Sequence, residues 1–285
     1  MSSQTTDSPA LAFLMRRLDA AADGAPAPDV IPTGYLGLDQ FLAGGLRRGD
    51  LVLLAGDVGS GKSALALGMA LRASRAGHNV LFMSGETTAD RLLERIASIE
   101  GRFPIGDLRR GRLSEETRLR ASMVLSEIRD SLPGFSFIAS PSPRQLAEEL
   151  RRSLDLEFAV VDGLAALLPG TRPRSRELAA ALTLLKRLAV ELGIALVVTS
   201  TPAATLAGRA DSRPTLEDLG ALGAAREVPD LILGIYREHI YHSYNVAVPD
   251  GATELLVLKN RNGPLGYVDM FFYAEWLRFE DVGEE

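Results

Sequence analysis

The stretch Gly56-Asp57-Val58-Gly59-Ser60-Gly61-Lys62-Ser63 decides the fold of this chain. It has a glycine, four intervening residues and then Gly-Lys-Ser, which is the spacing of a phosphate-binding loop. The apolar run over 51–55 is typical of a buried strand, and the segment over 64–71 predicts a helix. Because a phosphate loop lies between a strand and a helix, these flanks distinguish the match from a glycine-rich turn with a chance lysine.

Each part of this loop has a predicted role. The glycines allow several backbone N–H groups to face one anion, and the helix that follows contributes its positive end. Lys62 is expected to neutralise the β- and γ-phosphates, and Ser63 to hold Mg²⁺ through its hydroxyl group. The loop therefore predicts binding of a nucleoside triphosphate.

Strands and helices alternate from Ile31 onward. The predicted strands are 51–56, 79–84, 135–139, 157–162, 194–199, 230–236, 253–259 and 266–272. The predicted helices are 61–76, 88–99, 114–131, 143–154 and 174–192. This alternation predicts an α/β domain over 31–285, with a mostly parallel sheet between helices. The last strands follow one another without a helix, so we expect an antiparallel C-terminal extension at the sheet edge.

Residues 1–30 are expected to form an N-terminal arm. Residues 9–21 predict a short amphipathic helix whose apolar face holds Leu11, Leu14, Met15 and Leu18, and residues 23–29 predict a linker. This helix could pack on its own domain or dock on a neighbouring subunit.

Composition excludes some classes of function. The 285 residues include no cysteine, which excludes disulfides and thiolate sites and is compatible with the cytoplasmic location that we expect. No apolar run approaches the roughly 20 residues that span a bilayer, so we expect no membrane partner. A net charge of −6 argues mildly against a free-standing nucleic-acid binder. It leaves open a local basic channel built from several subunits.

Two carboxylates follow predicted strands. Asp162 ends the apolar run 158–161, where it could hold the hydration shell of Mg²⁺, although it could also cap a helix or turn. Glu86 follows the strand 79–84 and could polarise an attacking water, or it could be a solvent-exposed residue at a helix start. Lys259 and Arg261 come at the end of a late strand, before an Asn-Gly-Pro turn, which suits a phosphate contact or simple solvation.

Several segments, in this order, resemble the ATPase domain of DnaB-type replicative DNA helicases, within the wider RecA-like group. The resemblance covers about residues 31–281. Its segments are Ile31-Pro32-Thr33-Gly34 with Leu38-Asp39, the phosphate loop, Arg109-Arg110-Gly111-Arg112-Leu113-Ser114, Arg213-Pro214-Thr215-Leu216-Glu217-Asp218-Leu219 and Lys259-Asn260-Arg261-Asn262-Gly263-Pro264. The last block is the most specific, because a phosphate loop alone occurs in many ATPases.

The resemblance implies a role for each matched residue. It implies that Lys62 and Ser63 bind the phosphates and Mg²⁺ of ATP, that Glu86 is the catalytic glutamate and that Asp162 lies beside Mg²⁺. It implies that Lys259 and Arg261 reach the γ-phosphate bound by the adjacent subunit, with Arg261 as the arginine finger. It also implies a homo-oligomer, a hexameric ring around single-stranded DNA, with protein loaders or regulators as possible partners.

The sequence departs from the family at three places. Thr201 stands where the family has a glutamine that senses the γ-phosphate. Gly220-Ala221-Leu222-Gly223 stands where the family has Arg-Glu-Ser-Gly, which grips the DNA backbone. Arg209, Arg213 and Arg226 are nearby cations that could compensate. About 30 residues precede the ATPase segment, so we expect the family's N-terminal domain to be missing.

Three functions are compatible with these features. The first is an ATP-hydrolysing DNA helicase domain that acts as a ring on single-stranded DNA, as the overall resemblance implies. The second is a RecA-like oligomeric ATPase with a regulatory or partner-remodelling role and weak or no unwinding, as the departures suggest. The third is a nucleotide-binding assembly protein with negligible turnover, against which Glu86 and Arg261 argue.

We also consider whether Tyr236 and Arg237 flank the adenine base or merely end a buried strand.

Overall fold

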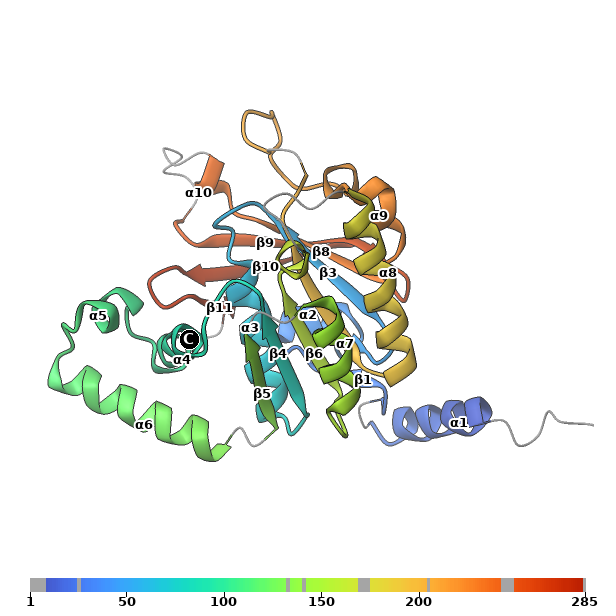
Figure 1. The fold of residues 1–285 in the computed structure, drawn as a ribbon, viewed down its shortest axis with the longest axis horizontal. Helices are drawn as coiled ribbons and strands as arrows, with labels where there is room; N and C mark the ends of the chain where they lie inside the picture. Colours follow the sequence, from blue (N-terminus) through green and yellow to red (C-terminus); the bar gives the residue numbers. More distant parts are fainter. Residues whose placement is uncertain are drawn as a thin grey trace, which may run out of the picture.

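The computed structural model describes residues 9–24, 27–131, 134–139, 142–168, 175–203, 206–241 and 249–283. At its centre is a nine-stranded sheet with the order β11-β10-β9-β8-β3-β7-β6-β4-β5 (Figure 1). The strands are β3 (Leu51–Gly56), β4 (Val80–Ser84), β5 (Phe135–Ala139), β6 (Phe158–Asp162), β7 (Ala195–Ser200), β8 (Leu231–Tyr236), β9 (Ala252–Asn260), β10 (Gly266–Tyr273) and β11 (Arg278–Asp281). Strands β8 to β5 in this order pair in parallel, and β9, β10 and β11 add antiparallel pairs at one edge.

The described helices are α1 (Pro9–Ala22), α2 (Leu36–Phe41), α3 (Lys62–Arg75), α4 (Ala89–Gly101), α5 (Ile105–Arg110), α6 (Glu115–Ser131), α7 (Pro143–Arg152), α8 (Ser175–Leu192), α9 (Ala224–Glu227) and α10 (Glu238–Tyr241). Short 3₁₀ turns occupy η1 (Leu164–Leu167), η2 (Leu216–Leu219) and η3 (Ala221–Gly223). A separate antiparallel pair joins β1 (Val30–Ile31) to β2 (Leu46–Arg47).

The predicted α/β architecture is confirmed, with element ends that shift by one or two residues. The elements that the sequence did not predict are short: β1, β2, β11, α2, α5, α9 and α10. Segments of two to six residues are too short for a helical or strand periodicity to show. Tertiary packing decides their conformation instead, and the buried Tyr35 and Leu38 tie α2 to the core.

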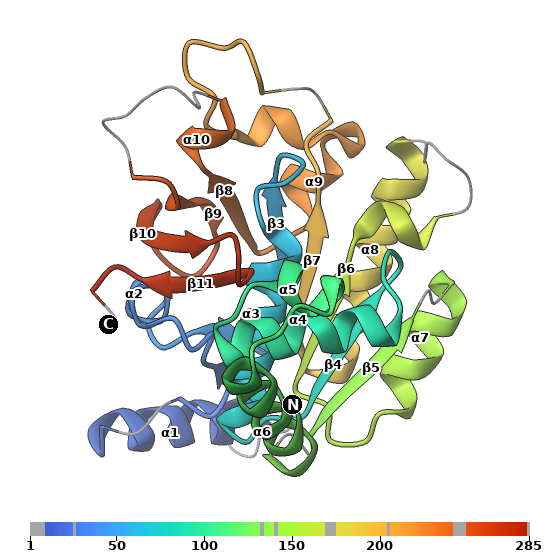
Figure 2. The ribbon, with the colours of Figure 1, turned by 90° about the vertical axis from the view of Figure 1, so that its left-hand side faces the viewer.

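The sheet separates two hydrophobic clusters. Val52 and Leu54 of β3 point into the cluster under α3 and α4, while Leu51 and Leu53 point into the cluster under α7 and α8. Helices α3 and α4 accordingly lie on the opposite side of the sheet from α7 and α8 (Figures 1 and 2). Each fully buried leucine contributes roughly 1.5–3 kcal/mol. The central strand β3 is therefore a rigid support for the loop that follows it.

The N-terminal helix α1 leaves its apolar face uncovered. Leu14, Met15 and Leu18 are 50%, 57% and 63% exposed. Among the described residues, the arm is held by ion pairs at Asp29, which contacts Arg17 at 3.5 Å and Arg47 at 3.3 Å. Of the two expected arrangements, packing of this face on its own domain is not observed within the part of the chain that the structure describes.

Within the described part of the chain, no helix combines the length and the apolar character needed to cross a membrane.

Candidate active site

The carboxyl ends of four parallel strands meet at one edge of the sheet. Ala55 of β3 pairs with Ser200 of β7, and Ser84 of β4 pairs with Asp162 of β6. The residues that follow these strands therefore surround a common space, as expected for parallel strands. They line a cavity of about 640 Å³ whose walls include Lys62, Ser63, Glu86, Asp162 and Thr201. The structure thus gathers every predicted site residue except Lys259 and Arg261 around the phosphate loop or its cavity.

The phosphate loop adopts a closed turn that leads directly into α3. Gly61 has φ of 100°, which strains any other residue, and a Cβ there would lie 2.8 Å from Cζ of Phe279. The Lys62 ammonium group donates to the backbone oxygens of Gly56 and Asp57, both at 2.9 Å. Burial lowers the pKa of Lys62, and the charge of Asp162 opposes that shift. The loop consequently holds a cation at its centre, with the first turn of α3 beside it.

A hydroxyl–carboxylate cluster lies next to this cation. Ser63 Oγ donates to Asp162 Oδ1 at 2.9 Å, and Thr199 Oγ1 donates to the same oxygen at 2.8 Å. Asp162 is buried, so these two hydrogen bonds orient its carboxylate. The sequence predicted Ser63 and Asp162 but not Thr199. Its place one residue before the end of β7, beside β6, is the signal that could have found it.

Glu86 and Arg95 complete the wall on the α4 side. Glu86 follows β4 by two residues and is exposed to the cavity, ahead of the helix that begins at Ala89. Arg95 of α4 also lines the cavity, and its buried Nε has no hydrogen-bond partner among the described residues. A buried donor without a partner is costly and points to a missing acceptor. Sequence reasoning missed Arg95, because one arginine on an amphipathic helix is usually solvated.

Another part of the cavity wall combines a cation with an aromatic ring. The Arg237 guanidinium lies 4.5 Å from the centroid of Phe272 and donates to the Gly59 oxygen at 3.3 Å. Burial lowers the pKa of Arg237, and Leu277 extends this apolar wall. Tyr236 is instead buried and stacks on Tyr241, away from the residues that line the cavity. Of the two residues considered for the base, Arg237 alone lines this space.

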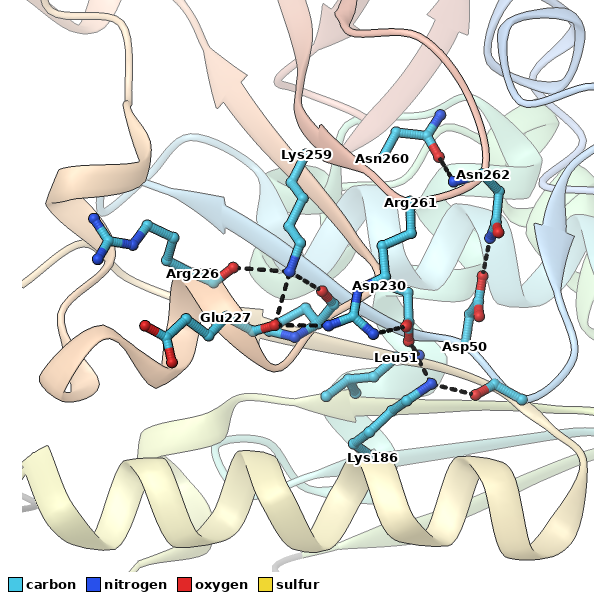
Figure 3. A network of polar contacts seen from close by, with 12 residues as sticks. Asp50, Leu51, Lys186, Arg226, Glu227, Asp230, Lys259, Asn260, Arg261 and Asn262 are labelled. Atoms are coloured by element: carbon cyan, nitrogen blue, oxygen red, sulfur yellow. Dashed lines mark hydrogen bonds and ion pairs between the residues drawn. The ribbon is translucent and has the colours of Figure 1, made fainter.

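Lys259 and Arg261 lie at the other end of the sheet. Lys259 pairs with Ile232 near the start of β8, level with Leu53 of β3. From Leu53 to Gly56 the strand runs a further ~10 Å to the loop. Lys259 Nζ donates to the oxygens of Arg226, Glu227 and Pro229 at 2.9, 2.8 and 2.6 Å (Figure 3). Neither cation reaches the phosphate loop of its own chain.

Asp50, next to this cation pair, has a carboxyl group whose pKa is shifted by its surroundings. It accepts a hydrogen bond from Asn262 Nδ2 at 2.7 Å, while burial and the charge of Asp230 raise its pKa to about 6. A carboxyl whose pKa is higher in the folded state stabilises the fold below pH ~4, and this contribution is lost as the pH rises through 6.

We therefore expect Asp50→Asn to stabilise the protein at pH 8 by about 1 kcal/mol, after allowance for solvent screening. The amide oxygen keeps the acceptor for Asn262 while the charge is removed. Thermal unfolding at pH 8, 7, 6 and 5 measures the difference from the wild type. A difference that grows as the pH falls would contradict the assignment.

The three candidate compensating arginines are all ion-paired. Arg209 makes a bidentate contact with the buried Asp218, which lowers the pKa of that carboxyl to about 2. Arg213 binds Glu254 through Nε at 2.7 Å. Arg226 contacts Glu217 at 2.8 Å, with side chains that are 44% and 80% exposed. Separating Arg209 from Asp218 would leave a buried carboxylate without its cation, which is unfavourable. An exposed pair is worth about 0–1 kcal/mol. Arg226 is therefore the most easily released of the three.

A known protein family matches most of this chain. The model of the DnaB-like helicase C terminal domain matches residues 30–281. The chain belongs to this DnaB-like family. It is 29% identical over 263 residues to the replicative DNA helicase DnaB of Geobacillus stearothermophilus, which covers 88% of this chain and 56% of that protein. The corresponding protein of Leifsonia xyli subsp. xyli is 30% identical with the same coverage. The chain thus spans about half the length of the curated relatives that it matches.

Solved structures show the same fold. One of them, described as an ATPase domain, has a TM-score of 0.86 and 24% identity, over 98% of this chain and 99% of that one. A DnaB-like replicative helicase, solved in a study of its interactions with primase, has a TM-score of 0.83 and 24% identity. It covers 98% of this chain and 68% of its own. Both agree with the mostly parallel sheet described above.

Proposed function

We propose that this chain is the ATP-hydrolysing domain of a DnaB-like DNA helicase and acts as a ring on single-stranded DNA. The observation that carries the proposal is the separation of two half-sites. The phosphate loop, Glu86 and Asp162 lie at one end of the sheet, while Lys259 and Arg261 lie at the other. Two complementary half-sites on opposite sides of one domain fit a head-to-tail interface, which generates a ring when the rotation between subunits closes.

The residues around the loop have separate roles in this proposal. Lys62 and the first turn of α3 bind the triphosphate, and Arg95 supplies a second cation at the cavity wall. The Ser63 hydroxyl and the Asp162 carboxylate are hard oxygen ligands that suit Mg²⁺, which usually keeps waters and phosphate oxygens as its other ligands. When bound, Mg²⁺ would offset the charge of the phosphates. Glu86 is exposed to the cavity, where it can accept a proton from the attacking water.

Contact with DNA is proposed to use Arg226. The segment Gly220 to Gly223 carries no cation, and α9 follows it directly with Arg226 exposed. Its partner Glu217 is too exposed to compete strongly with a phosphate. Arg209 remains bound to a buried carboxylate and is the poorer candidate.

The test is steady-state ATP hydrolysis with and without single-stranded DNA, combined with native mass measurement. We expect a ring whose hydrolysis rises several-fold with DNA at low salt, because phosphate contacts weaken as salt rises. Arg226→Ala should weaken DNA binding about tenfold and lower its salt dependence by about one phosphate contact. Rings that hydrolyse ATP without binding DNA would contradict the helicase function and support the partner-remodelling role. An absence of hydrolysis under all conditions would exclude both.

A further inference from the structure

Asp230 lies between Arg261, the cation proposed to act on the neighbouring subunit, and the start of the central strand β3. It is the residue before β8, and its side chain is 5% exposed. Its Oδ2 accepts from the backbone nitrogen of Leu51 at 2.9 Å and from Lys186 Nζ at 2.7 Å. Its Oδ1 accepts from Arg261 Nη1 at 2.9 Å (Figure 3). The resemblance on which the function rests assigns no role to Asp230.

We infer that Asp230 is a positioning residue, which aims the guanidinium of Arg261 at the nucleotide of the adjacent subunit. This inference rests on the proposed function, because it requires a catalytic site shared between subunits. It adds a residue that touches no nucleotide and acts only through Arg261. Because Leu51 begins β3, the carboxylate links Arg261 to a strand that is buried along its whole length.

The contacts of Arg261 hold its guanidinium group in place but leave part of it available to a neighbouring subunit. Nη1 binds Asp230, and Nη2 binds the Glu227 oxygen at 2.9 Å. These contacts leave further N–H groups of the guanidinium available, and the side chain remains 49% exposed. One edge of the planar group is therefore held by the domain while the other can face a neighbouring subunit. A planar group that is held at one edge loses less freedom when its other edge binds phosphate.

The chemistry of Asp230 allows a selective change. In Asp230→Asn an amide oxygen at the Oδ2 position still accepts from Leu51 and Lys186. The amide NH₂ group then lies at the Oδ1 position, where its donors face the donors of Arg261. The strand contact is kept while the contact that orients Arg261 is lost. A misplacement of about 1 Å in a catalytic group can cost ~100-fold in rate, so we expect a loss of kcat of roughly 10- to 100-fold with little change in KM.

Mixed oligomers show whether Asp230 acts in the subunit that supplies Arg261 or in the subunit that binds the nucleotide. The acceptor chain carries Arg261→Ala and keeps its phosphate loop, while the donor chain carries Lys62→Ala and keeps Arg261. Active sites then form only where a donor cation enters an acceptor loop, at about a quarter of the interfaces of a 1:1 mixture. Asp230→Asn placed in the donor chain should lower this restored ATPase rate by about 10-fold or more. The same change placed in the acceptor chain should leave it unchanged.

Glu280→Gln provides the matched control. Glu280 is also buried, at 5% exposure, and pairs with two cations, Arg278 and Arg102, but it lies on β11. Placed in the donor chain, it should leave the restored rate intact. Native mass measurement and thermal unfolding check that each chain enters the mixed oligomers. If Asp230→Asn does not assemble, Asp230→Glu, which keeps the charge and moves the carboxylate by one methylene, should show the same dependence on the donor chain.

The outcomes separate the inference from the function on which it rests. If donor and acceptor chains that keep Asp230 restore no activity when mixed, the proposed site shared between subunits is contradicted. If they restore activity and Asp230→Asn lowers it equally in either chain, Asp230 is structural and the inference is overturned. An unchanged rate with the change in the donor chain overturns it as well.

Discussion

Arg261→Ala is expected to lower the rate of ATP hydrolysis by a factor of about 10³ or more and to change nucleotide affinity less than about threefold. An arginine supplied by a neighbouring subunit acts mainly on charge that develops in the transition state, so its removal affects kcat rather than binding. The position of Arg261, at the end of the sheet opposite to its own phosphate loop, leads to this separation of effects. The measurement pairs steady-state kinetics with equilibrium binding of a fluorescent ATP analogue.

Loss of folding or of assembly could also lower the rate of Arg261→Ala, and both can be checked. Asp230 keeps Lys186 and the Leu51 amide as donors in the variant, so no buried charge is left alone. Native mass measurement shows whether the oligomer persists. Arg151→Ala, which removes an exposed arginine paired with Glu191, is the control and should keep the wild-type rate. A parallel loss of affinity and rate in Arg261→Ala would place this residue in its own nucleotide site and contradict the trans arrangement.

The fold was predictable because its decisive elements are long and locally consistent. The runs 51–56 and 158–161 are continuous and apolar, and helix α8 keeps an apolar face over Ser175–Leu192. The antiparallel extension was also predictable, since β9 and β10 follow one another across an Asn-Gly-Pro turn. β11 was not predicted, because Arg278–Asp281 has a single apolar residue, and its Phe279 is buried against Phe272.

The candidate site was predictable where chemistry follows a strand end and unpredictable where it depends on packing across the sheet. Asp162 ends β6 and Glu86 follows β4 by two residues, so their meeting at one edge follows from parallel pairing. Thr199 reaches the site through the register of β7 beside β6, and Arg95 through the position of α4 over the cavity. A single sequence shows neither. The same holds for Asp230, whose carboxylate joins contacts from distant parts of the chain.

Lys62→Ala is expected to weaken ATP binding itself and to abolish hydrolysis. Charge-assisted hydrogen bonds contribute about 1.5–3 kcal/mol each, which corresponds to a loss of affinity of roughly 10- to 100-fold. The Lys62 ammonium group is held inside the loop by the oxygens of Gly56 and Asp57, so it is already placed for the phosphates before ATP arrives. The measurement is equilibrium binding of ATP, with hydrolysis followed in the same preparation.

Lys259→Ala is the informative comparison, because both lysines donate to backbone oxygens but lie at opposite ends of the sheet. Loss of either amine removes hydrogen bonds from carbonyl groups, so both variants share that structural cost. Loss of affinity should follow Lys62→Ala alone, whereas Lys259→Ala should lower the rate and keep the affinity. Equal affinities in the two variants would contradict the assignment of the phosphate loop. If Lys259→Ala alone weakened ATP binding, that result would instead place the nucleotide at the end of the sheet where β8 begins.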